Sequence, residues 1–60
     1  MRLEYREEKS VVAALRDHTM IGVVAAAANL SIGECLAVLL RLQREGRVRQ
    51  CAAECWELVE

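Results

Sequence analysis

Residues 30–48, LSIGECLAVLLRLQREGRV, contain the start of a helix, the glycine that ends it and the start of a strand. Ser31 and Glu34 have the spacing of a capping box, in which each side chain bonds the backbone N–H of the other. Gly46 suits the left-handed conformation that often follows the last turn of a helix. The stretch therefore predicts a helix that begins at Ser31 and stops at Gly46.

Apolar residues within this helix are spaced for one buried face. Cys35, Val38, Leu39 and Leu42 stand at positions i, i+3, i+4 and i+7, which places them on a single stripe toward a core. After the glycine, the alternation of residues 47–50 is typical of a half-buried strand. This part of the sequence therefore predicts a core helix followed by a strand.

The rest of the chain predicts two more helices and a second strand. A first helix is expected from about residue 6 to residue 18, and an alanine-rich second helix from residue 21 to residue 30. Whether residues 1–5 form a short strand or extend the first helix is open. The inward positions are expected to be Val11, Val12, Leu15 and His18 in the first helix, and Ile21, Val24, Ala25 and Ala28 in the second.

Two turns complete this outline. Asn29, which tolerates left-handed dihedral angles, begins a tight turn before the third helix. The strands are expected at residues 47–51 and 55–59, joined by a short loop, with Val48, Trp56 and Leu58 on one face. The predicted fold class is mainly α with a small β-hairpin.

Length and composition limit the possible classes of protein. Sixty residues allow one domain, residues 1–60, with one small core, and a hydrophobic content of 55% excludes disorder. The net charge of −1 gives no global positive field. A charged N-terminus and apolar runs too short for a membrane span predict a cytoplasmic protein with no membrane partner.

The order of helix, helix, tight turn, helix and hairpin resembles the winged helix-turn-helix superfamily. The resemblance covers residues 10–59. It is carried by Leu30-Ser31, the spacing of Leu39 and Leu42, the run Arg44-Glu45-Gly46-Arg47-Val48 and the closing Cys55-Trp56-Glu57-Leu58. Small members with a similar layout include pilus-operon regulators, prophage-encoded regulators and the C component of ferrous-iron uptake systems.

The resemblance implies DNA as a partner, with the third helix in the major groove and the hairpin, or wing, on the flanking backbone. The implied positions are Ser31, Ile32, Gly33, Glu34, Leu36, Ala37 and Leu40, with Arg41, Arg44, Arg47 and Arg49 on phosphates. The arginines suit phosphate contacts, or else a solvated surface with pairs such as Arg41 to Glu45. Among the base-facing positions, only Ser31 is a residue type that reads base edges.

Apolar and small residues on the outward faces of the second and third helices favour a different partner. Exposed apolar patches usually mark interfaces. The candidate protein interface, for a homodimer or another protein, comprises Val23, Ala26, Ala27, Leu36, Ala37 and Leu40. A winged-helix interaction or dimerisation module without DNA binding is therefore the alternative to a small DNA-binding transcriptional regulator or accessory factor.

No group of residues predicts catalysis, a metal or a cofactor. His18 is expected to end the first helix, and Glu7 and Glu8 suit the first turn of that helix. Cys51 and Cys55 flank the hairpin turn and are expected to lie opposite each other, which would allow a disulfide. Reduced thiols without a metal or redox role are the favoured interpretation of all three cysteines.

Overall fold

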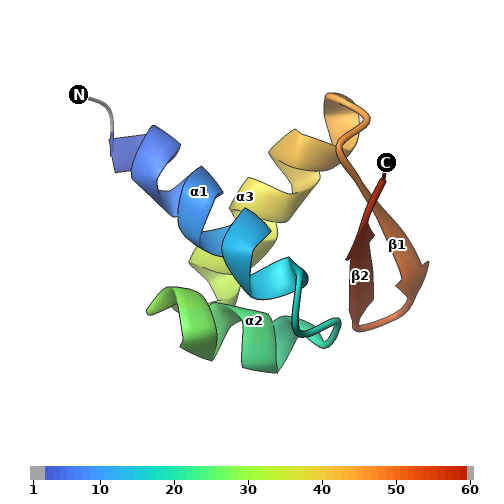
Figure 1. Cartoon of the computed structure of the whole chain (residues 1–60), viewed down its shortest axis with the longest axis horizontal. Helices are drawn as coiled ribbons and strands as arrows, with labels where there is room; N and C mark the ends of the chain where they lie inside the picture. The colour runs from blue at the N-terminus through green and yellow to red at the C-terminus, as the bar shows by residue number, and fades with distance from the viewer. Residues whose placement is uncertain (1–2, 60) are drawn as a thin grey trace.

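The computed structural model describes residues 3–59, and the side chains of residues 6–59 (Figure 1). It contains helices α1 (Leu3–Leu15), α2 (Ile21–Ala28) and α3 (Ile32–Arg44), followed by strands β1 (Val48–Ala52) and β2 (Cys55–Leu58). The three helices pack together, and the antiparallel hairpin stands beside them as a wing. Three helices plus a two-stranded wing is the predicted fold class, which is confirmed.

Helix α3 forms as its sequence predicts. The Glu34 N–H donates to Ser31 Oγ at 3.1 Å, and the Ser31 N–H donates to Glu34 Oε1 at 3.0 Å, so both halves of the capping box are present. At the other end, Gly46 adopts a φ of 75° and the Arg47 N–H donates to the Leu42 carbonyl. These contacts satisfy backbone groups that a helix end leaves without intrahelical partners.

Helix α2 meets α3 at an angle of 102°, within the range of a helix-turn-helix. The predicted second helix was too long by two residues, because Asn29 adopts a left-handed φ of 61° and ends it at Ala28. The Asn29 N–H donates to the Ala26 carbonyl, and the Leu30 N–H to that of Ala25. The tight turn predicted at Asn29 is therefore confirmed.

Helix α1 differs from its prediction at both ends. It begins at Leu3, so residues 3–5 extend the helix, while Met1 and Arg2 lie outside the described residues. It ends at Leu15 and not at His18, because the following residues turn toward the hairpin. The Trp56 N–H donates to the Thr19 carbonyl, and Met20 forms an isolated antiparallel bridge with Cys55. Residues 19–20 thus pair with β2 through an isolated bridge, outside the two-stranded sheet.

One apolar core joins all five elements. The predicted face of α3 is buried, and Trp56, the only large ring among the buried side chains of residues 6–59, is 2% exposed. The two strands are shifted slightly from their predicted bounds, but Val48 and Trp56 are buried and Leu58 packs against them, as expected. The buried set is Val11, Ala14, Leu15, Val24, Ala25, Cys35, Val38, Leu39, Leu42, Val48 and Trp56.

Candidate functional site

The outward face of α3 carries large apolar side chains. Ile32, Leu36 and Leu40 are 57%, 37% and 43% exposed. They stand four residues apart, and side chains at that spacing form one ridge along a helix. Gly33 and Ala37 are also exposed and lie beside this ridge. We call Ile32, Gly33, Leu36, Ala37 and Leu40 the α3 face.

The start of α3 offers little for reading bases. Ser31 and Glu34 are exposed, but both are engaged in the capping box. The pKa of Glu34 is lowered by two hydrogen bonds with Ser31. The larger effect comes from the Ser31 backbone, and the smaller from the Ser31 side chain. A carboxylate at this position repels phosphate groups, so it does not favour binding of a DNA backbone at the start of α3.

The α2 residues of the predicted interface are exposed but do not all lie beside the α3 face. Val23, Ala26 and Ala27 are exposed on α2. Val23 lines a shallow surface groove with residues 17–20, so it lies at the start of α2, next to exposed Met20. The α3 residues of the predicted interface, Leu36, Ala37 and Leu40, therefore form its continuous part, and Ile32 and Gly33 extend this part toward the start of the helix.

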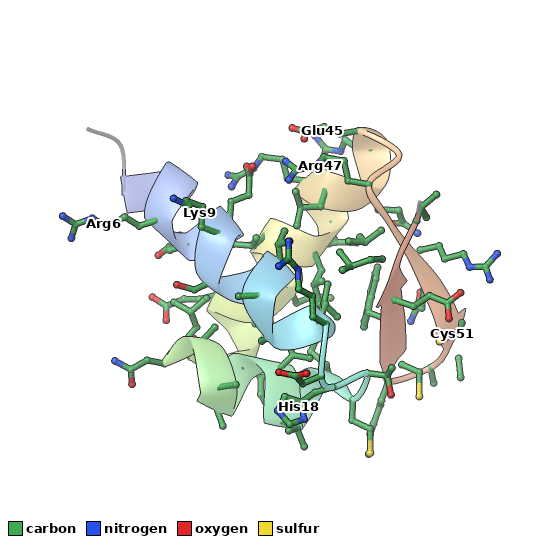
Figure 2. All side chains as sticks on the ribbon, in the orientation of Figure 1. Arg6, Lys9, His18, Glu45, Arg47 and Cys51 are labelled. Atoms are coloured by element: carbon green, nitrogen blue, oxygen red, sulfur yellow. The ribbon has the colours of Figure 1, made fainter. Side chains whose placement is uncertain are left out.

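Two of the four predicted phosphate-binding arginines contact helix α1. Arg41 Nη2 lies 3.0 Å from Glu8 Oε2, and Arg47 Nη1 lies 2.8 Å from Glu8 Oε1. Arg47 also lies 3.6 Å from Glu45, and both of these residues are labelled in Figure 2, at the end of α3. The Glu8 carboxylate thus connects α1, α3 and the start of β1.

The other two arginines lie in different places. Arg49 on β1 pairs across the hairpin with Glu57 on β2, its register partner. Arg44 is exposed near the end of α3 and forms no ion pair with any side chain of residues 6–59. The structure does not gather the four arginines into one basic patch beside the α3 face, because acids on α1 and β2 hold three of them.

The wing does not place Cys51 opposite Cys55, so that prediction was wrong. A bulge between Gln50 and Ala52 makes Cys51 the extra residue, and the register partner of Cys55 is Ala52. All three cysteines are free thiols, and burial raises the pKa of Cys35. Within residues 3–59 no cluster of His, Cys, Asp and Glu has the geometry of a metal site.

His18 lies beyond the end of α1 and is exposed, whereas an inward position on the first helix was expected. Figure 2 shows it near the connection between α1 and α2. Its backbone N–H donates to the Ala14 carbonyl at 2.9 Å, so the main chain of His18 closes the helix end.

Sequence reasoning missed the role of Glu8, which it assigned to the first turn of a helix. In the structure, Glu8 lies inside α1 and is the common partner of two distant arginines. The only signal was the contrast between an acidic N-terminal segment and the arginine-rich segment 41–49, which gives charge complementarity without naming a pair.

Comparisons of the chain with protein-family models, with curated proteins and with solved structures give no match. In residues 3–59, no single helix combines the length and apolar character that crossing a membrane requires. Helices α2 and α3 meet those criteria of length and composition only together, across their 102° bend. The assignment of a function therefore depends on the geometry described above.

Proposed function

We propose that this chain is a winged-helix protein-interaction module that forms a homodimer through the α3 face. One observation carries the proposal: the helix that would enter a DNA groove exposes Ile32, Leu36 and Leu40 to solvent. Removing such apolar side chains from water is a main driving force for protein association. A leucine ridge is suited to another apolar helix better than to a charged groove.

A two-fold antiparallel pairing of α3 with α3 of a second copy fits this face. It places Leu36 of each copy against Leu40 of the other, because the two positions are symmetric about Val38. Gly33 and Ala37 lack bulky side chains, and no atom lies within 4 Å of a Cβ built on Gly33, so the backbones can approach closely. The proposed interface is therefore self-complementary in shape.

Charge is complementary in the same arrangement. Glu34 lies in the first turn of α3 and Arg44 in the last turn. A pairing symmetric about Val38 puts Arg44 of each copy opposite Ile32 of the other, less than one turn from Glu34, so its long side chain can reach that carboxylate. Arg44 forms no ion pair with the described side chains of its own copy, residues 6–59. A parallel pairing would instead place like charges together, which is unfavourable.

The proposal predicts that Leu40→Glu abolishes the dimer. Two buried carboxylates near the two-fold axis would be unpaired, so association weakens by at least about thirtyfold, as for a typical hot spot. Sedimentation equilibrium over a range of protein concentrations measures this effect. Val59→Glu is the matched control, since Val59 is 46% exposed but lies after β2, and it leaves the association unchanged. A wild-type chain that stays monomeric at millimolar concentration contradicts the proposal.

A charge exchange tests the antiparallel orientation separately. Arg44→Glu and Glu34→Lys each weaken the dimer by about two- to fivefold, the range of exposed ion pairs. The double variant recovers most of the loss, because the pair is restored with opposite signs. Additive losses in the double variant would exclude this orientation while leaving the α3 face as the interface.

DNA binding is the second candidate function, and the helix-wing arrangement with exposed Arg44 favours it. In that case Ser31, Gly33, Glu34 and Ala37 would lie near the groove, and the arginines would contact phosphates with salt-dependent affinity. Replacing Arg44 and Arg47 by alanine would then lower both DNA affinity and its salt slope. A dimer that presents two wings is compatible with this activity.

A cytoplasmic location belongs to the same proposal. It is supported by the three free thiols, which suit a reducing compartment.

A further inference from the structure

A groove that contains no residue of the α3 face in its lining lies between α1 and the start of β1. It has a volume of about 320 Å³, at the lower end of the range for small-molecule sites. Figure 2 shows Lys9 on α1 and Arg47 at the connection that leads into β1. The groove is lined by Glu8, Lys9, Val12, Ala13, Arg16 and Arg47.

The lining is cationic although the whole chain has a net charge of −1. It contains three cations and a single carboxylate, that of Glu8. Glu8 divides its two oxygens between Arg47 and Arg41, and Arg41 lies outside the groove. The Glu8 charge is therefore shared with Arg41, while Arg47 also lies 3.6 Å from Glu45. Arg16 is the lining arginine that forms no ion pair with the side chains of residues 6–59.

The positions of the arginines favour an anion. Arg47 is fixed by its 2.8 Å bond from Nη1 to Glu8, and its side chain is still 48% exposed. Arg16 follows the last residue of α1, is exposed, and forms no ion pair with the side chains of residues 6–59. Guanidinium groups bind carboxylates and phosphates through paired, charge-assisted hydrogen bonds.

The floor of the groove is apolar. Val12 is half-buried against the core, and Ala13 is exposed one residue further along α1. A ligand that fits both parts has a charged group for the arginines and an apolar body for these two side chains. The same features would give bare inorganic anions only the electrostatic part of the binding energy.

We propose that the groove between α1 and β1 binds a small organic anion, a carboxylate or phosphate monoester attached to an apolar body. The anionic group lies between Arg16 and Arg47, and the body rests on Val12 and Ala13. Lys9 adds long-range attraction at the edge. This site is independent of the α3 face, so it can be occupied in a monomer or a dimer.

Amide-resolved NMR titration with phenyl phosphate and with benzoate tests the proposal and distinguishes the two anion types. Saturable shifts are expected at Val12, Ala13, Arg16 and Arg47, weaker ones with inorganic phosphate, and none with neutral benzyl alcohol. Arg16→Gln weakens the affinity for the preferred probe about tenfold, while Arg6→Gln, at an exposed arginine of α1 outside the groove, leaves it unchanged.

A second variant, Ala13→Glu, places a carboxylate on the exposed floor and abolishes binding without removing a cation. The same spectra report whether each variant remains folded. The proposal is overturned if neither probe gives saturable shifts at about 10 mM, or if Arg16→Gln and Arg6→Gln weaken binding equally.

Discussion

Leu39 and Leu40 are neighbours in the chain but lie on opposite faces of α3. Leu39 is 0% exposed and packs in the core, whereas Leu40 is 43% exposed. The inward face is covered by α1, α2 and the wing, and the outward face by nothing in residues 3–59. The same residue type is therefore buried on one side of α3 and exposed on the other, the side for which we propose association.

The side of α3 that carries Arg41, next to α1, differs from the inward and the outward face because it makes ion pairs. Its contacts are charged and are already made within the chain, since Glu8 binds Arg41 and Arg47. Polar groups that could meet DNA are thus used internally, while apolar groups that could be buried internally are exposed. This inversion is the reason for proposing a protein partner for α3.

The largest effect is expected for Leu39→Ala. It removes a fully buried side chain from a small core and lowers the free energy of unfolding by about 3 kcal/mol. Leu40→Ala is the matched control and changes it by less than about 0.5 kcal/mol in dilute, monomeric protein. Urea unfolding followed by Trp56 fluorescence measures both. Equal losses for the two leucines would remove the distinction between the faces.

The next largest effect concerns the ion pairs of Glu8 with Arg41 and Arg47. Glu8→Gln breaks two ion pairs at once and lowers the free energy of unfolding by about 1 kcal/mol, because these side chains are only partly exposed. The loss shrinks in high salt, which screens the pairs. Glu57→Gln, which breaks only the hairpin pair with Arg49, serves as the control with a smaller loss. Urea unfolding at two salt concentrations compares them.

The smallest effect concerns the capping box. The folded pKa of Glu34 lies below its ordinary value of 4.5, so its carboxylate stabilises the fold above that pH. This contribution is lost as the pH falls from about 4.5 through the lower folded pKa. Ser31→Ala removes the side-chain hydrogen bond of Ser31, the second cause of the lowered pKa of Glu34, so that pKa returns partway toward its ordinary value. Titration of the Glu34 carboxyl carbon by NMR checks this, and an unchanged pKa would assign the shift to the backbone bond alone.

Local signals made α3 predictable. The capping box, the stripe from Cys35 to Leu42 and Gly46 all act within a few residues, so the sequence contains the whole of the physical cause. The turn at Asn29 is predictable for the same reason. The buried faces of α2 and of the wing were predictable from periodicity. Apolar residues recur at helical spacing in α2 and at alternate positions in the strands, and both spacings are read from the sequence alone.

Long-range contacts account for what the sequence did not predict. The early end of α1 depends on the pairing of Thr19 and Met20 with β2, across more than thirty positions. The Glu8 pairs join residues 33 and 39 positions apart. The bulge at Cys51 depends on register between strands, which the turn residues Ala53 and Glu54 do not specify. The end of α1, the Glu8 ion pairs and the bulge at Cys51 all depend on residues that only the tertiary structure brings together.

The most direct measurement is a pair of NMR experiments on one labelled sample, a dilution series and a titration with mixed-sequence duplex DNA at low and moderate salt. On dilution, we expect amide shifts at Gly33, Leu36, Ala37 and Leu40, because these residues leave the dimer interface. In the DNA titration, we expect no shifts at these residues. Salt-sensitive DNA shifts at residues 31–37 and 44–49, with no change on dilution, would contradict the proposed dimer and identify α3 as a DNA-binding helix.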